Sequence, residues 1–166
     1  MLLYHGSTVH VKHPQIFNTN PFLDFGAGFY TTSSYEQAER WAKVKMRREN
    51  KTTGYVTVYD FDLKQAKQNG QIVVFQEANE SWLRFVIDNR RGIAPAVMAD
   101  LYVGPVADDN VYAAIKLFEA GIYHVEETLK RLKTEVLKDQ WTFRTEHMLS
   151  YLTYLEEKEI FSEVRL

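Results

Sequence analysis

Hydrophobic positions recur along the chain with two kinds of spacing. Alternation of apolar and polar residues is typical of strands, and recurrence every three to four residues is typical of helices. Apolar and β-branched runs predict strands at residues 1–5, 29–32, 55–63, 71–75, 99–104, 140–144 and 160–164. Helical spacing predicts helices at residues 35–49, 79–92, 109–120, 125–136 and 146–155. Because these elements lack a regular βαβ alternation, the pattern favours a mixed α+β fold with helices packed on a twisted, mostly antiparallel sheet core.

Local signals set the expected ends of several helices. Ser34 followed by Gln37 matches a capping box, so the first helix is expected to begin directly after Ser34. Gly54 is expected to stop that helix. Asp108 or Asp109 is expected to cap the helix at 109–120. The side chains expected to face the core are Ala38, Trp41 and Ala42 in the first of these helices, and Tyr112, Ile115 and Phe118 in the second.

Composition narrows the class of protein. The chain has 166 residues, of which 45% are hydrophobic, and this predicts a single domain over residues 1–166. The net charge of −2 gives no general attraction to nucleic acid or to an anionic membrane. The absence of cysteine excludes disulfides, thiol nucleophiles and cysteine zinc sites. No apolar run approaches the ~18 residues of a membrane span, so we expect a cytoplasmic protein without a membrane partner.

Two stretches near the start of the chain carry the candidate chemistry. In "LYHGS", a predicted strand ends in His5, Gly6 and Ser7, and in "DFGAGFYTT" two glycines precede Phe29 and Tyr30. Glycine allows a ligand to approach the backbone closely, and serine adds a hydroxyl group. The functional interpretation makes His5 and Tyr30 two walls of a ligand pocket. The structural alternative makes His5 a hydrogen-bonded strand residue and both aromatic residues part of the core.

Together these stretches resemble the ADP-ribosyltransferase superfamily, in its diphtheria-toxin and poly(ADP-ribose) polymerase branch. That branch has a histidine on one strand, a tyrosine on the next and a glutamate on a late strand. The resemblance implies that NAD is the co-substrate, that His5 holds a ribose hydroxyl and that Gly6 offers its backbone to the nicotinamide amide. Ser7 completes this motif, and Tyr30 is the signature aromatic residue. Trp41 would stack under the nicotinamide, with a core position as the alternative.

Most of the chain is also similar to DUF3990, a family of small bacterial proteins assigned to this superfamily. The shared motifs are "YHGS", "DFG-x-GFY-x-T", "QA-x-x-WA", "GPVADD" and a late "Q-x-x-F-x-T". Genes of that family resemble members of toxin–antitoxin pairs. The resemblance therefore implies a toxin role with an antitoxin protein as partner.

Gln140 stands where the resembling branch has its glutamate. Its amide carbonyl can accept a hydrogen bond from a ribose hydroxyl, but it cannot act as a general base, which is worth ~10²–10⁴ in rate. Asp139 and Glu146 are close in sequence, although Asp139 would face away from Gln140 in a strand. Asp108 or Asp109 is a second candidate for the missing base, with helix capping as the simpler role.

Three functions follow from this pattern. The first is an NAD-dependent mono-ADP-ribosyltransferase that modifies an unknown protein or nucleic acid. The others are an inactive module that binds NAD, ADP-ribose or a protein, and an NAD glycohydrolase. No metal site is predicted, because no metal-ligand spacing is present. A basic run is either a solvated helix end or a contact for NAD phosphates or an acidic target; it comprises Lys43, Lys45, Arg47, Arg48 and Lys51.

Overall fold

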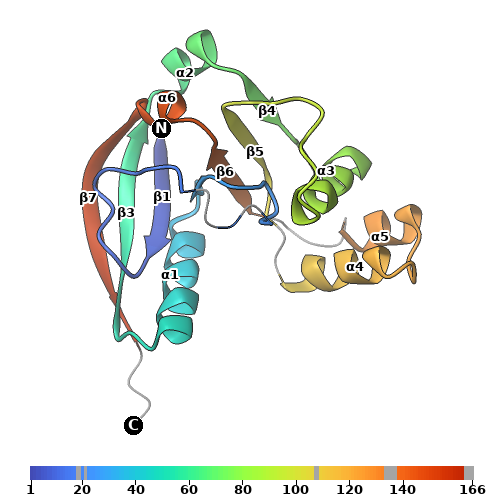
Figure 1. Ribbon diagram of the computed structural model, residues 1–166. Helices are drawn as coiled ribbons and strands as arrows, with labels where there is room; N and C mark the ends of the chain where they lie inside the picture. Colours follow the sequence, from blue (N-terminus) through green and yellow to red (C-terminus); the bar gives the residue numbers. More distant parts are fainter. Residues whose placement is uncertain (18–19, 21, 107–108, 133–137, 163–166) are drawn as a thin grey trace.

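The computed structural model describes residues 1–17, 20, 22–106, 109–132 and 138–162. Its strands form two sheets (Figure 1). The first sheet is antiparallel and has the order β1-β3-β7, with β1 at Leu2–Ser7, β3 at Thr53–Phe61 and β7 at Leu152–Phe161. The second has the order β2-β6-β5-β4, with β2 at Phe29–Thr31, β6 at Asp139–Phe143, β5 at Leu101–Pro105 and β4 at Ile72–Val74. Only the β4–β5 pair of the described ladders is parallel, so the expected mostly antiparallel α+β fold is confirmed.

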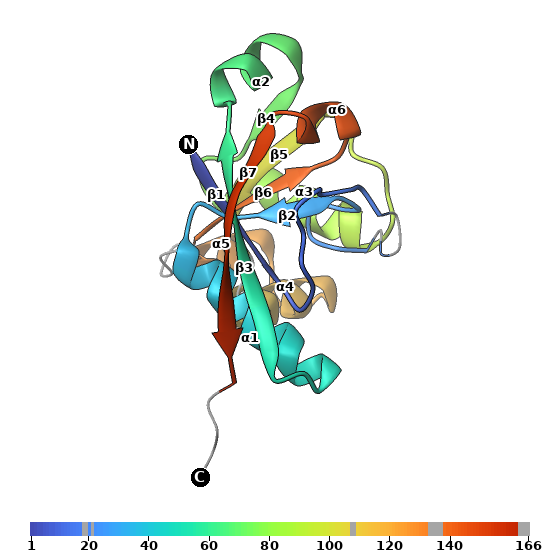
Figure 2. The ribbon, with the colours of Figure 1, turned by 90° about the vertical axis from the view of Figure 1, so that its left-hand side faces the viewer.

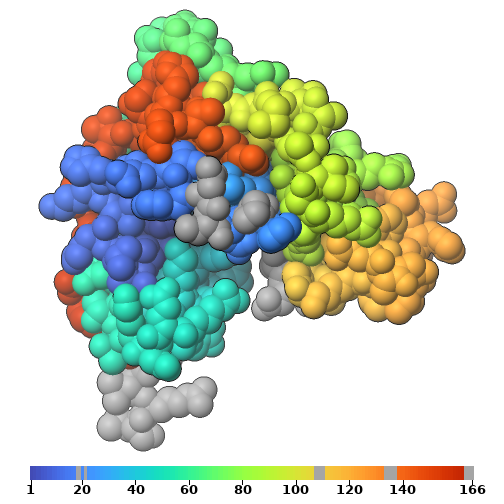
Figure 3. Space-filling view, viewed as in Figure 1, coloured from blue at the N-terminus to red at the C-terminus, as the bar shows by residue number. Residues whose placement is uncertain are grey.

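Six helices surround these sheets within the described residues. They are α1 at Tyr35–Glu49, α2 at Leu63–Asn69, α3 at Glu80–Arg90, α4 at Asp109–Glu119, α5 at Val125–Leu132 and α6 at Glu146–Leu149. Helix α1 packs on β1 and β3, and α4 packs beside α5. The strands of the second sheet run steeply across those of the first (Figure 2). In the space-filling view, α1 and the α4–α5 pair form separate masses on the lower side of the molecule (Figure 3).

The core divides into three clusters because each sheet has its own covered faces. The first cluster gathers around Phe25, Trp82 and Tyr102, under α3 and α4. The second includes Phe29, Tyr59, Phe61, Leu101 and Phe143, contributed by both sheets. A smaller cluster of Ala38, Met46, Val56 and Ile160 fixes α1 to the first sheet. Since Phe29 and Tyr30 are consecutive in β2, strand alternation turns one ring into the second cluster and the other into the first.

Helix α1 begins as its sequence predicts but ends differently. The Ser34 side chain accepts the Gln37 backbone N–H at 3.3 Å, which confirms Ser34 as the N-cap. The reciprocal half of the capping box is absent, because the Gln37 side chain donates instead to the Asp139 carbonyl. The helix ends at Asn50, whose φ of 52° is left-handed. Gly54 is therefore not the stop signal, and it lies inside β3.

Two side chains expected in the core are exposed. Ala38 and Ala42 are buried as predicted, but Trp41 is 45% exposed, because it lies outside the buried face of α1, which is formed by Gln37, Ala38, Ala42 and Met46. Tyr112 is 43% exposed. On α4 the buried positions are Val111, Ala114 and Ile115, so only Ile115 of the predicted face is fully enclosed.

The C-terminal part of the chain differs most from its predicted structure. Helix α6 covers only Glu146–Leu149, after the predicted N-cap Thr145, and β7 replaces the expected continuation to residue 155. Leu152 and Leu155 fit a helical spacing, but β7 pairs with β3 from Leu152 to Phe161, and this long-range ladder supplies the backbone hydrogen bonds. Helix α2 was also not expected, since the strand prediction continued through Leu63. No helix in the described part of the chain is long and apolar enough to cross a membrane.

Candidate functional site

Three strands from distant parts of the sequence meet where the two sheets join. Tyr4 of β1 exchanges backbone hydrogen bonds of 2.8 and 3.0 Å with Thr32, next to β2. Strand β2 pairs with β6, so that Tyr30 lies opposite Thr142. Gln140 is two residues before Thr142 on the same strand and hence on the same face. The structure thus brings the three motif-bearing strands into direct contact (Figure 1).

The His5 ring is held in one orientation and one protonation state. Its Nδ1 lies 2.6 Å from the Tyr30 carbonyl oxygen, and the ring stacks on Phe29 with centroids 4.4 Å apart. A carbonyl oxygen can only accept, so Nδ1 carries the proton and Nε2 remains an acceptor. Burial, reinforced by the positive charge of Lys45, lowers the pKa of His5 to about 3 against the effect of the Tyr30 hydrogen bond. The imidazole is therefore neutral at physiological pH.

The Tyr30 side chain lies on the other side of β2. Its hydroxyl donates to the Gly26 carbonyl at 2.6 Å and accepts the Phe25 N–H at 3.1 Å. Burial raises the pKa of Tyr30, so the phenol stays protonated. Because His5 stacks on Phe29 while the Tyr30 ring packs into the first core cluster, the two rings are not two walls of one pocket. The two residues meet through the Tyr30 carbonyl instead.

Gly6 and Ser7 have clear structural roles. A Cβ at Gly6 would overlap the carbonyl oxygen of Ala38, so only glycine lets β1 approach α1 this closely. The Gly6 carbonyl accepts a hydrogen bond from the Lys45 ammonium at 3.1 Å. Burial lowers the pKa of Lys45. The Ser7 hydroxyl accepts the Val9 N–H at 3.2 Å and so shapes the turn after β1.

The glycine turn before β2 is anchored by contacts that the sequence did not predict. Gly26 has a φ of 72°, a left-handed conformation that glycine adopts easily. The Arg144 guanidinium donates to the Phe25 carbonyl at 2.7 Å. Asp24 and Arg90 form an ion pair of 2.7 Å in which both side chains are largely buried. The turn is thereby fixed to α3 and to the end of β6.

Gln140 is buried and its amide has a defined orientation. It is 4% exposed and lies opposite Gly104 in the β5–β6 ladder. Its Nε2 donates to the Pro105 carbonyl in a long hydrogen bond of 3.4 Å. The next side chain on this face, Thr142, is fully buried opposite Tyr30, and its hydroxyl interacts with the Tyr30 phenol.

Asp139 ties the start of α1 to β6, and sequence reasoning gave it no such role. Its Oδ1 accepts the Thr32 hydroxyl and the Ser33 N–H, both at 2.9 Å, and its Oδ2 accepts the Trp141 indole N–H at 2.8 Å. Burial by itself would raise the pKa of Asp139, but these hydrogen bonds outweigh it and lower the pKa. Asp139 and Gln140 lie on opposite faces of β6, as strand alternation predicted. No local signal links residues more than a hundred positions apart.

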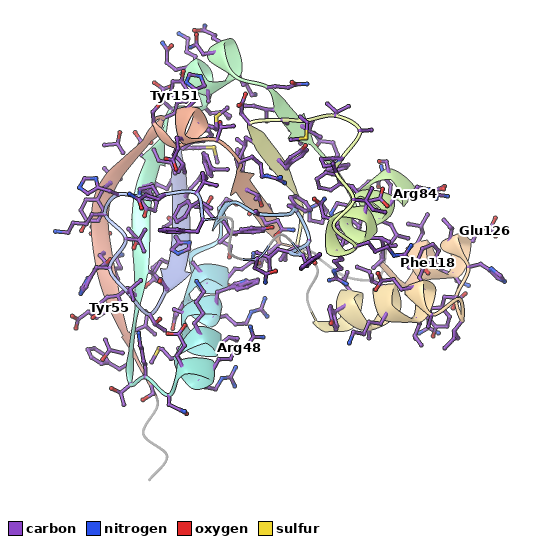
Figure 4. All side chains as sticks on the ribbon, in the orientation of Figure 1. Arg48, Tyr55, Arg84, Phe118, Glu126 and Tyr151 are labelled. Atoms are coloured by element: carbon purple, nitrogen blue, oxygen red, sulfur yellow. The ribbon has the colours of Figure 1, made fainter. Side chains whose placement is uncertain are left out.

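Trp41, Arg47 and Arg48 are exposed on α1, Lys45 is partly buried against β1, and Lys51 follows the end of the helix. Trp41 lies on α1, the element that follows β2 and Tyr30 in the chain. Its side chain is exposed enough for the ring to contact a ligand. Arg48 projects from the side of α1 that faces away from the sheet (Figure 4). Lys43 pairs with Glu39 at 2.7 Å, one turn earlier. Lys45 donates to the β1 backbone, at Gly6, so the basic residues do not act as one patch.

Two hollows border this region. One, of about 650 Å³, is lined by polar residues near the start of α1, among them Ser33, Ser34 and Glu36. The other, of about 400 Å³, lies between α2, β4, β5 and β6. Neither of these two is lined by the predicted site residues, which are His5, Gly6, Ser7, Tyr30, Trp41 and Gln140.

The other residues predicted as candidates for the missing base are Asp108, Asp109 and Glu146. Asp108 lies outside the described residues, and of Asp109 the structure gives only that α4 begins there. Glu146, in the first turn of α6, accepts the Ile16 N–H at 2.9 Å. It follows the end of β6, whereas Gln140 lies near the start of that strand. Among the described residues, no group of three or more histidine and carboxylate side chains could hold a metal ion.

Comparison with known proteins gives one match. Residues 1–154 match the family described as "Protein of unknown function (DUF3990)". No curated protein and no solved structure shows significant similarity to the chain. The match runs from the first strand into β7 and so includes every strand that carries a motif. The chain therefore belongs to the DUF3990 family.

Proposed function

We propose that the protein is an NAD-dependent mono-ADP-ribosyltransferase that modifies a macromolecular acceptor, a protein or a nucleic acid. The reaction breaks the bond between nicotinamide and C1′ of the ribose. Nicotinamide leaves with the bonding electron pair, and a nucleophile of the acceptor forms the new bond to C1′. The proton of that nucleophile must pass to a base or to water. A role as the toxin of a toxin–antitoxin pair, with an antitoxin protein as partner, extends the same proposal.

One observation carries this proposal, namely the direct contact of the three motif-bearing strands. Strands β1, β2 and β6 are far apart in sequence, yet β2 lies between the other two. Gln140 and Thr142 share the face of β6 that continues into Tyr30 of β2. A site built on three rigid strands holds its groups in place without an ordering cost at the moment of reaction.

Gln140 would position NAD without acting as a base. The Pro105 carbonyl fixes the amide nitrogen, so the amide oxygen is presented as a hydrogen-bond acceptor. A ribose hydroxyl is a suitable donor for it. A neutral amide cannot remove the proton of the acceptor, which suits a nucleophile that is already reactive.

His5 and Trp41 would contact other parts of NAD. Because Nδ1 is fixed by the Tyr30 carbonyl and the ring is neutral, Nε2 is an acceptor suited to a second ribose hydroxyl. The half-exposed indole of Trp41 has a free surface for the flat nicotinamide ring. The Gly6 carbonyl already accepts from Lys45, so a nicotinamide amide would have to share or displace that contact.

The Gln140→Ala variant tests the proposal. We expect nicotinamide release from NAD in the presence of a cell lysate to fall about tenfold to hundredfold, because a buried ribose hydroxyl loses its partner, a cost of ~1–3 kcal/mol. Gln140→Glu should leave transfer to the native acceptor little changed and raise hydrolysis of NAD by water. Chromatography of nicotinamide and labelling of the lysate with tagged NAD measure both reactions.

Gln68→Ala, an exposed glutamine on α2, is the matched control and should behave as the parent protein. If Gln140→Ala and the parent transfer equally well, Gln140 is not in the site. Release of nicotinamide in buffer alone would identify an NAD glycohydrolase instead. NAD binding without release would identify a binding module.

Trp41 gives a separate test that needs no acceptor. NAD should quench Trp41 fluorescence, and Trp41→Ala should weaken NAD binding several-fold, since ring stacking contributes ~0.5–1.5 kcal/mol beyond area burial. Trp41→Phe keeps an aromatic face and should retain most of the affinity. Titration calorimetry with the three proteins measures the effect. Equal affinity of Trp41→Ala and the parent would remove Trp41 from the site.

A further inference from the structure

The hollow of about 400 Å³ is lined by residues of α2, β4, β5 and β6. Asp139 and Trp141 line it, whereas Gln140 between them points to the other face. Its walls are mainly apolar, with Ile72 and Val103 next to Trp141. Its volume falls within the ~300–1,000 Å³ of small-molecule sites. None of the residues proposed to contact NAD, which are His5, Trp41 and Gln140, lines this hollow.

The aromatic wall of this hollow is fixed before any ligand arrives. The Trp141 indole N–H donates to Asp139 Oδ2 at 2.8 Å, and the ring makes an edge contact with Phe61 at a centroid distance of 5.9 Å. Trp141 is nevertheless only half-buried, so part of its ring stays accessible. A rigid aromatic surface binds a flat ring at low entropic cost.

The charges around the hollow favour an anion. Lys67 of α2 and Lys138 before β6 both line it, and both are exposed. Within the described part of the chain, neither ammonium group forms an ion pair. The carboxylate of Asp139 is engaged by Thr32, Ser33 and Trp141. An apolar floor with two unpaired cations at its rim matches a molecule that has a flat ring and one anionic group.

We propose that this hollow binds a small aromatic anion, a molecule of one or two fused rings that bears a carboxylate or a phosphate. The ring packs against Trp141, Ile72 and Val103, and the anionic group lies between Lys67 and Lys138. This site does not depend on the proposed transferase activity. Its occupation and NAD turnover can be measured independently.

Nuclear magnetic resonance of the indole N–H groups tests the site directly. The chain has three tryptophans, Trp41, Trp82 and Trp141, and a Trp141→Phe variant assigns the relevant signal. Titration with 2-naphthoate and with 2-naphthyl phosphate should shift the Trp141 signal to saturation and leave Trp41 and Trp82 unchanged. The stronger of the two probes shows whether the site prefers carboxylate or phosphate. The uncharged 2-naphthol should bind several-fold more weakly.

Variants that remove a lysine charge test the proposed contact with the anionic group. Lys67→Ala and Lys138→Ala should each weaken naphthoate binding about threefold, and together about tenfold, as expected for two exposed charge contacts. Lys64→Ala is the matched control, since Lys64 is exposed on the same helix but does not line the hollow. An unmoved Trp141 signal or a shift confined to Trp41 would overturn the proposal. So would binding of naphthol to the parent protein, or of naphthoate to the double variant, that is as strong as binding of naphthoate to the parent protein.

Discussion

The Gly6→Ala variant is expected to lose about 3 kcal/mol or more of its free energy of unfolding, the upper end of the usual cost of overpacking. A Cβ there would overlap the Ala38 carbonyl oxygen and lie 2.9 Å from the Ala42 nitrogen. Both obstructing atoms belong to the α1 backbone, so no side chain can rotate away. Helix α1 would have to move off the first sheet, which would open the cluster of Ala38, Met46 and Val56. Urea unfolding followed by circular dichroism measures the loss.

Gly121→Ala separates packing from backbone effects. Gly121 has a φ of 72°, and among the described residues beyond its chain neighbours no atom lies within 4 Å of a Cβ built there. Its replacement should therefore cost only the strain of the left-handed conformation, about 1 kcal/mol. Equal losses for the two variants would mean that close approach to α1 is not why Gly6 is glycine.

These two glycines illustrate what the sequence could and could not predict. A break at Gly121 follows from local chemistry, and helix α4 does end just before it. The function of Gly6 depends on a helix more than thirty residues later, so the glycine was interpreted as room for a ligand. Its observed neighbour is the α1 backbone.

The same distinction between local and long-range causes explains which helices and strands were predictable. Helices α1 and α3 were predictable because Ser34 and Asn79 cap them and their apolar faces repeat locally. Strand β7 was only partly predictable, because it is an edge strand whose exposed residues hide the alternation and whose hydrogen bonds come from β3. Trp41 shows the opposite failure, since its helical spacing indicated a core position but the covered surface of α1 is narrow.

In the candidate site, too, the features with local causes were predictable and those with long-range causes were not. Its strands were predicted from local patterns, and the structure brings them into contact. The direction of each side chain was not predictable, because it depends on which face of β2 each core cluster covers. The anchoring pairs Asp24–Arg90 and Asp139–Thr32 join segments with no common local pattern.

Acidification is expected to destabilise the protein through His5. Its pKa is lowered to about 3 in the folded protein, first by burial and then by Lys45, against an ordinary value of 6.5. Below pH 6.5 the unfolded chain binds a proton at His5 that the folded chain does not bind. The stability due to neutral His5 is therefore complete above pH 6.5 and is lost progressively as the pH falls towards 3. Each pH unit costs up to about 1.4 kcal/mol, so about 2–3 kcal/mol disappears over two units.

His5→Gln isolates this contribution, because glutamine can still donate to the Tyr30 carbonyl but does not titrate in this range. Urea unfolding of both proteins at about pH 6.5 and about pH 4.5 should show a clearly flatter pH dependence for His5→Gln. His13→Gln, an exposed histidine, should keep the slope of the parent protein. Asp139 does not obscure the comparison, because its lowered pKa moves its own loss of stability to more acidic solution, below its ordinary value of 3.8. If the parent and His5→Gln lose stability in parallel, His5 is protonated in the folded state, and its Nε2 is then a donor and not the acceptor proposed for NAD.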